Sequence, residues 1–189
     1  MNKLVLYMVL LASYISNAQD TVKCSIITSI GEIQVELFAE NAPITVNNFL
    51  QYVDHKLYDN TNFYRVCTAE NEAEREIKIE VVQAADMTED QLFPAINIET
   101  TEITKVKHLN GTISMARGEP NTAQSSFFIC INNQPELDFG GKRNPDGYGF
   151  AAFGRVIKGM DIVLKIQSGN NQNQILDNPI AIYSIRRIN

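Results

Sequence analysis

The apolar residues of this chain fall into many short runs with a two-residue period, and this pattern constrains the fold more than any other feature. Alternating apolar residues over 22–37, interrupted by Ser29-Ile30-Gly31, predict a β-hairpin. Short runs bounded by turn residues or charges predict further strands at 62–66, 77–83, 112–116, 126–131, 151–157 and 180–188. So many short strands indicate a mainly β protein.

Two segments instead carry the spacing of a helix. Apolar residues in 42–53 recur at helical intervals behind Pro43, whose missing N–H costs nothing in a first turn. A second, shorter helix is predicted over 159–166. Short strands combined with two helices predict a closed antiparallel β-barrel that is capped by the helices.

Length and charge limit the organisation of the chain and its partners. The 189 residues contain no repeat, Gly/Ser linker or low-complexity run, so one domain is expected. The formal net charge is −6, and no basic stripe interleaves with aromatic residues. Both observations argue against nucleic acid and anionic membrane surfaces as partners.

The first residues have the features of a cleaved export signal. Lys3 precedes an apolar run over 4–14, and Ser16-Asn17-Ala18 places small residues at the −3 and −1 positions of a cleavage site. An uncleaved anchor is the alternative, but this run is shorter than the ~20 residues that a membrane-spanning helix needs. We therefore expect a signal peptide over 1–18 and a mature domain over 19–189. The mature protein would be periplasmic or secreted and would have no membrane anchor.

The cysteines and histidines suggest neither a disulfide framework nor a metal site. Cys24, Cys67 and Cys130 are odd in number and show no C-x-x-C spacing, so at most one bridge could form. The favoured interpretation is three small, buried thiols in strands. His55 and His108 lie far apart without nearby ligands, and no metal is predicted.

Four segments, in order along the chain, resemble the cyclophilins. They are GEIQVELFAENAP (31–43), YDNTNFYRV (58–66), ISMA with SSFFI (113–129), and LD with FGRV (137–156). Together they span nearly the whole of the chain that follows the signal. The resemblance implies an eight-stranded cyclophilin-like β-barrel and the activity of a peptidyl-prolyl cis/trans isomerase that needs no metal or organic cofactor.

The resemblance also implies a catalytic arginine, which would be Arg65. Rotation about an X-Pro bond must break amide conjugation across a barrier of ~18–20 kcal/mol. In the twisted transition state the prolyl nitrogen gains a lone pair, so a donor aimed at this nitrogen stabilises the transition state more than the ground state. The guanidinium of Arg65 could reach the prolyl nitrogen and a neighbouring carbonyl with one fork.

Gln83 would be the second catalytic residue and would hold the substrate backbone. Period-two alternation places Gln83 on one strand face with Val81, and Arg65 on one face with Phe63. Of two adjacent phenylalanines, Phe127 is assigned to the core and Phe128 to the pocket. The substrate-binding residues implied by the resemblance are Phe63, Val81, Ala116, Phe128 and Leu137.

Several positions depart from the family pattern. An acidic run over 69–76 is inserted between Arg65 and Gln83, and we expect it to be solvated. The usual Gln-Gly-Gly-Asp reads Gln83-Ala84-Ala85-Asp86, which puts the turn in doubt because Ala takes a positive φ less readily than Gly. The other departures are Glu80 for a common Phe, Glu136 for a Trp, Phe150 for a His and Arg117 for an Asn.

The sequence therefore predicts a monomeric prolyl isomerase that binds proline-containing segments of exported proteins and assists their folding. The alternative is a catalytically weak cyclophilin scaffold that binds proline peptides or acts as a chaperone. The retained Arg65 favours the enzyme, whereas Glu80 and the two alanines after Gln83 keep the alternative open.

Overall fold

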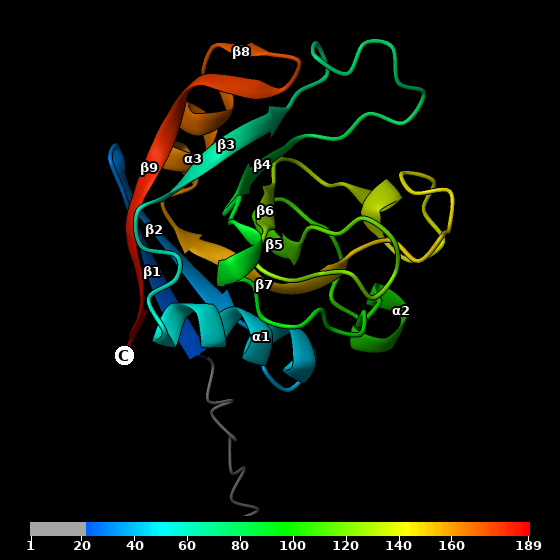
Figure 1. Ribbon diagram of the computed structural model, residues 1–189. Helices are drawn as coiled ribbons and strands as arrows, with labels where there is room; N and C mark the ends of the chain where they lie inside the picture. Colours follow the sequence, from blue (N-terminus) through cyan, green and yellow to red (C-terminus); the bar gives the residue numbers. More distant parts are fainter. Residues whose placement is uncertain (1–21) are drawn as a thin grey trace, which may run out of the picture.

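The computed structural model describes residues 22–189, and the predicted signal peptide lies outside them. Antiparallel strands dominate this part of the chain (Figure 1). The strands are β1 (Val22–Thr28), β2 (Gly31–Leu37), β3 (Thr61–Cys67), β4 (Val81–Ala84), β5 (Thr112–Met115), β6 (Phe127–Cys130), β7 (Ala151–Lys158), β8 (Asn171–Gln172) and β9 (Ile175–Ile188).

Eight of these strands form a closed barrel. Their order is β1-β2-β7-β5-β6-β4-β3-β9, and β1 also pairs with β9, so the sheet closes on itself. The short strand β8 pairs only with β9 and lies outside the ring. Closure removes the exposed sheet edges that a flat sheet would present. The predicted fold class is confirmed.

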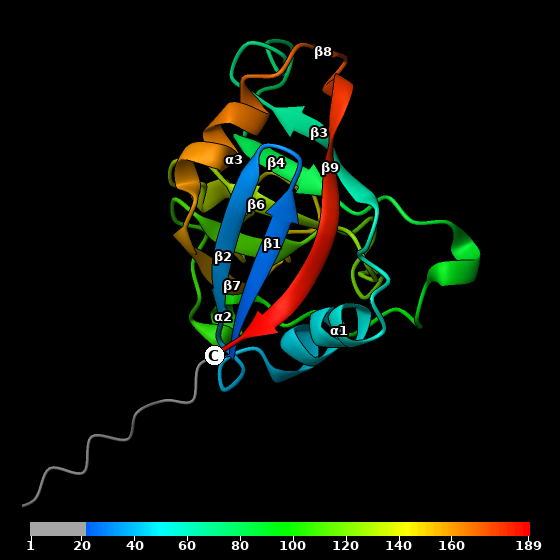
Figure 2. The same ribbon diagram turned by 90° about the vertical axis from the view of Figure 1, so that its left-hand side faces the viewer.

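Helices lie at the ends of the barrel (Figures 1 and 2). Helix α1 (Pro43–Asp54) lies at the end where β9 finishes, and α3 (Met160–Gln167) lies near the opposite end. Both were predicted, whereas α2 (Thr101–Thr104), a single turn, was not. No helix within residues 22–189 is long and apolar enough to cross a membrane.

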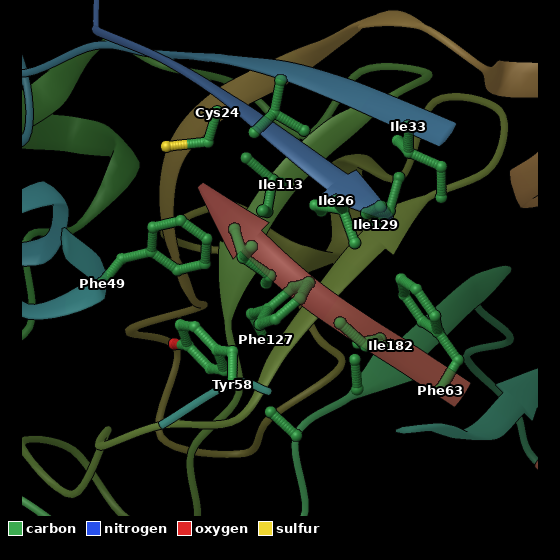
Figure 3. Packing of buried hydrophobic residues seen from close by; sticks show 14 of the residues in the cluster. Cys24, Ile26, Ile33, Phe49, Tyr58, Phe63, Ile113, Phe127, Ile129 and Ile182 are labelled. Carbon is green, nitrogen blue, oxygen red and sulfur yellow. The ribbon is translucent and has the colours of Figure 1, made fainter. Parts of the chain in front are cut away.

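The barrel interior is filled by branched aliphatic and aromatic side chains (Figure 3). Ile26 and Ile33 from the first hairpin meet Ile113 and Ile129 from β5 and β6 in one fully buried cluster. Period-two alternation brings these residues to one face of their strands, as the sequence predicted for Ile26 and Ile33.

An aromatic group connects α1 to this interior. Phe49 of α1 lies 5.1 Å from Tyr58 and 5.5 Å from Phe127 between ring centroids, and the contact with Phe127 is edge-to-face. The Tyr58 hydroxyl donates a hydrogen bond to the carbonyl oxygen of Ser125, so its polar end is satisfied although the side chain is buried. The helix is thereby fixed over the end of the barrel.

Two details differ from the sequence prediction. The strand predicted over 77–83 begins only at Val81, and residues 68–80 form an irregular excursion that we call the β3–β4 insertion. The C-terminal strand begins at Ile175, five residues earlier than predicted. All three cysteines are buried and free, as the favoured interpretation held.

Candidate active site

A pocket of about 210 Å³ opens on the outer side of the barrel wall that β3, β4 and β6 form. It combines an apolar floor with a cationic rim. Its lining residues are Arg65, Arg75, Ile79, Val81, Gln83, Ala116, Arg117, Phe128, Leu137, Arg143, Asn144 and Phe150. Six of the seven predicted site residues are therefore brought together.

The pocket floor is a second apolar cluster, separate from the barrel core. Val81, Phe128 and Leu137 pack together there, and Ala116 and Phe150 contact the cluster from its edge. The Phe150 ring meets the Phe128 ring edge-to-face at 5.4 Å between centroids. This arrangement forms an apolar depression of a size suited to a small ring.

Alternation along β6 separates the two adjacent phenylalanines as predicted. Phe127 belongs to the barrel core, whereas Phe128 belongs to the pocket cluster. Val81 and Gln83, two residues apart on β4, both face the pocket. The alternation of side chains along each strand therefore determines which residues build the core and which build the pocket.

Arg65 and Gln83 meet directly across the β3–β4 pairing. Nη1 of Arg65 donates a hydrogen bond to Oε1 of Gln83 at 2.7 Å. The Gln83 amide Nε2 then donates to the Tyr64 hydroxyl at 2.7 Å and to Oγ of Ser126 at 3.0 Å. The orientation of the Gln83 amide is thus determined at both ends.

Phe63 does not line this pocket. Its side chain is fully buried in the barrel core, where it meets Phe127 edge-to-face. The predicted common face of Phe63 and Arg65 is wrong, because the strand register shifts between them by a β-bulge. Val66, three residues after Phe63, also points into the core. The bulge redirects Arg65 outward.

Most of the acidic run predicted over 69–76 is exposed, as its charge suggested, but Glu72 is an exception. Glu72 is only 1% exposed, and its carboxylate accepts hydrogen bonds from the Arg143 guanidinium and from the amide of Ile79. Burial alone would raise the pKa of Glu72, but the Arg143 and Ile79 hydrogen bonds lower it below its ordinary value. The insertion therefore forms a wall of the pocket, with Ile79 and Arg75 in its lining.

Sequence reasoning missed Gln174. It lies in the turn between β8 and β9, and its Oε1 accepts hydrogen bonds from both Nε and Nη2 of Arg65, the former at 3.0 Å. Its Nε2 donates to Oε1 of Glu72 at 3.1 Å. Arg65 thus has two glutamine partners, Gln83 on one side and Gln174 on the other.

The structure shows the surroundings of three residues that depart from the family pattern. Glu80 points away and accepts a hydrogen bond from Asn132, while its neighbour Ile79 supplies the apolar wall. Ala85 does adopt a positive φ, +65°, so the turn after Gln83 is kept without a glycine there. On the rim, Arg117 lies over the Phe150 ring and pairs with Asp146 at 2.8 Å.

A buried polar group lies beneath the pocket floor. His108 stacks beside Phe128, and its two ring nitrogens lie 2.8 Å from Asp138 Oδ1 and 2.9 Å from Ser114 Oγ. Burial lowers the pKa of His108, although the Asp138 carboxylate opposes this effect. The neutral ring then donates to Asp138 through Nδ1 and accepts from Ser114. Since Ser114 is fully buried, the group supports the floor and cannot contact a peptide.

Among residues 22–189, no three His, Cys, Asp or Glu side chains come close enough together to hold a metal ion.

A second hollow of about 270 Å³ adjoins the pocket and shares Gln83, Ala116 and Arg117 with it. The two hollows therefore lie side by side.

Comparisons with known proteins agree with this architecture. A family model described as cyclophilin type peptidyl-prolyl cis-trans isomerase/CLD matches residues 23–187. The chain is 33% identical over 169 residues to peptidyl-prolyl cis-trans isomerase A of Dickeya dadantii, covering 85% of this chain and 82% of the relative. It is also 33% identical over 143 residues to peptidyl-prolyl cis-trans isomerase B of Escherichia coli, covering 74% of this chain and 80% of the relative.

Solved structures share the fold. A crystal structure of a cyclophilin type peptidyl-prolyl cis-trans isomerase from Cryptosporidium parvum superposes with a TM-score of 0.71 at 21% identity, covering 89% of this chain and 98% of the other. A second structure of that protein, obtained in the presence of the dipeptide Ala-Pro, gives a TM-score of 0.70 at 22% identity, covering 88% of this chain and 99% of the other.

Proposed function

The chain belongs to the cyclophilin-type peptidyl-prolyl cis-trans isomerase family, and from this premise we propose that Arg65 and Gln83 carry its catalysis in the pocket described above. The observation that carries this proposal is the direct hydrogen bond of 2.7 Å between these two side chains at the edge of an apolar socket. A proline ring would occupy the apolar socket that Val81, Phe128 and Leu137 form. The X-Pro bond would then lie beside the guanidinium.

The hydrogen bonds of Arg65 leave it able to act on the substrate. A guanidinium has five N–H groups, and Arg65 uses three of them, on Nε, Nη1 and Nη2, for Gln83 and Gln174. One N–H on each terminal nitrogen has no partner within residues 22–189. These two donors remain available for the prolyl nitrogen and a nearby carbonyl oxygen.

The fork would act by stabilising the rotated amide. As the prolyl nitrogen loses conjugation it becomes a hydrogen-bond acceptor, and Arg65 bonds to it more strongly in the transition state than in the ground state. The floor of the socket holds the ring in place while the acyl side rotates. No bond is made or broken, so no general base or cofactor is required.

Replacement of Arg65 tests this assignment. In a protease-coupled assay on an Ala-Xaa-Pro-Phe peptide, Arg65→Ala should lower kcat/KM by roughly 10²–10³, the effect of losing one preorganised donor. Arg155→Ala is a matched control, because Arg155 is an exposed arginine on β7 that pairs with Glu36. If folded Arg65→Ala keeps the wild-type rate, the assignment of catalysis to Arg65 is wrong, whereas a folded wild-type protein without activity would favour the alternative of a proline-peptide binding module.

We further propose that this isomerase assists the folding of exported proteins. The support is the sequence of its N-terminus, with Lys3, the apolar run and Ser16-Asn17-Ala18. Mass spectrometry of protein recovered from the periplasm or medium of a bacterial host should find Gln19 as the first residue. Recovery of intact chain from the cytoplasm alone would contradict the proposal.

A further inference from the structure

We propose that Glu72 of the β3–β4 insertion is a positioning residue for catalysis, because it orients Gln174, which in turn holds the guanidinium of Arg65. The inference rests on the proposed catalytic role of Arg65. It assigns a purpose to the insertion, which is the largest departure of this chain from the family pattern.

The first step is the placement of Gln174 beside Arg65. The backbone amide of Val66 donates to the carbonyl oxygen of Gln174 at 2.8 Å, so the turn is tied to the strand that carries the arginine. Gln174 has a positive φ of +74°, which directs its side chain back across β3. Its Oε1 there receives the Nε–H of Arg65 at 3.0 Å and a second bond from Nη2.

The second step concerns which end of the Gln174 amide faces the arginine. A primary amide has an accepting oxygen and a donating nitrogen, and only the oxygen can bind a guanidinium. Glu72 determines the orientation of this amide, because its carboxylate can only accept hydrogen bonds. Its Oε1 accepts a hydrogen bond from Nε2 of Gln174 at 3.1 Å. With Glu72 in place, the Gln174 oxygen has to point to Arg65.

The third step is the rigidity of Glu72 itself. Its second oxygen accepts from the Ile79 amide at 2.8 Å and from Nη1 of Arg143 at 2.8 Å. Nη1 of Arg143 also donates to the carbonyl oxygen of Ile77 at 2.7 Å, and the side chain of Arg143 is 7% exposed. A buried carboxylate held by an arginine and a backbone amide cannot reorient freely.

The insertion is also fastened to the β8–β9 turn independently of Glu72. Nδ2 of Asn71 donates to Oδ1 of Asn171 at 2.9 Å and to the carbonyl oxygen of Val66 at 3.0 Å. The three segments that carry Arg65, Glu72 and Gln174 therefore move together. A positioned guanidinium loses less freedom when it meets the twisted amide, which lowers the barrier.

The test uses isosteric variants and matched controls in the full chain. We call the hydrogen-bonded chain from Glu72 through Gln174 to Arg65 the relay. Gln174→Leu removes both the oxygen that binds Arg65 and the amide nitrogen that binds Glu72. Glu72→Gln replaces the carboxylate, which can only accept, by an amide. Gln172→Leu, on β8 beside the turn, and Glu74→Gln, in the same insertion, make the same changes at exposed positions. We expect each relay variant to lower kcat about tenfold with little change in KM, and the controls to remain at the wild-type rate.

A double-mutant cycle separates positioning from a general structural role. If Gln174 and Glu72 act only through Arg65, neither substitution should lower kcat/KM further in an Arg65→Ala background, where residual exchange is measured by NMR at high enzyme concentration. Equal losses in both backgrounds would overturn the inference, as would relay variants with the wild-type rate. Thermal unfolding of each variant identifies any that fail to fold. For these, Gln174→Met decides, because its side chain is close in size to glutamine but offers Arg65 no amide oxygen: a wild-type rate contradicts the relay.

The proposed function fails in a different way. If Arg65→Ala itself retains activity, the catalytic assignment is wrong and the relay with it. If Arg65→Ala is inactive while Gln174→Leu and Glu72→Gln are fully active, only the relay is wrong.

Discussion

Phe127 and Phe128 are adjacent in β6, yet Phe127 lies in the barrel core and Phe128 lines the pocket on the outer wall. Phe127 meets Phe49, Tyr58 and Phe63, all fully or almost fully buried. Phe128 meets His108 and Phe150. One pair of adjacent residues thus belongs both to the barrel core and to the pocket floor.

Truncating each phenylalanine should separate the two roles. Phe127→Ala should lower the free energy of unfolding by about 3–5 kcal/mol, because it leaves a cavity in a closed core. Phe128→Ala should cost less stability, since its site already opens on the pocket, but should raise KM for a prolyl peptide roughly tenfold through lost apolar contact. Urea unfolding and steady-state kinetics measure the two effects. A larger stability loss for Phe128→Ala would contradict this division.

Two glycines of the loop before β7 form a matched pair for a steric prediction. Gly147 and Gly149 have φ values of +68° and +65°, so both substitutions to Ala incur backbone strain of about 1–2 kcal/mol. A Cβ at Gly147 meets open space, whereas a Cβ at Gly149 meets the backbone of Leu137 and Asp138. Gly149→Ala should therefore be clearly less stable than Gly147→Ala, and should raise KM because Leu137 must shift. Similar melting temperatures for the two variants would show that the loop adapts.

The buried His108 predicts a pH dependence of stability. Its pKa is lowered from the ordinary value of 6.5 by burial, so the unfolded chain binds its proton at a higher pH than the folded protein. The contribution to stability is complete above about pH 6.5 and is lost as the pH falls through the lower folded value. Urea unfolding between pH 7 and pH 5 should show this decline, and His108→Gln should show a shallower one. Equal slopes in both proteins would contradict the prediction.

Glu136 predicts weak inhibition by cyclosporin. The resemblance places it where sensitive members carry a tryptophan, whose indole would offer an apolar face and an N–H donor. Here the Glu136 carboxylate instead accepts the backbone amide of Lys142 at 2.8 Å. Glu136→Trp should tighten binding by roughly 1–3 kcal/mol with little change in peptide turnover. Tight inhibition of the wild type in the same assay would show that this position is unimportant.

The sequence predicted those parts of the fold that depend on local periodicity. The hairpin over 22–37, helix α1 and the opposite faces of Phe127 and Phe128 all follow from period-two or helical spacing. The same rule failed at Phe63, because one extra residue in the strand reverses every face that follows it. Nothing in the local pattern around Phe63 marks the bulge.

The relay from Glu72 through Gln174 to Arg65 could not be predicted for a different reason. Glu72 lies in an acidic run that is typical of a solvated loop, and its partner Arg143 is 71 positions away in the chain. Gln174 lies 109 positions from Arg65 and has no apolar periodicity of its own. Contacts of this kind depend on how distant loops meet over the finished barrel, which only the tertiary structure determines.

The seam between β1 and β9 has a consequence for how this protein is made. β1 is the first strand of the described chain to be synthesised and β9 the last, so their ladder cannot form until translation is nearly complete. Until then β1 and β3, the two barrel strands that pair with β9, present open edges, and closing the barrel joins residues that lie far apart in the sequence. Folding should therefore be slow and post-translational, and loss of even the last few residues of β9 would leave an unclosed sheet that is prone to aggregate.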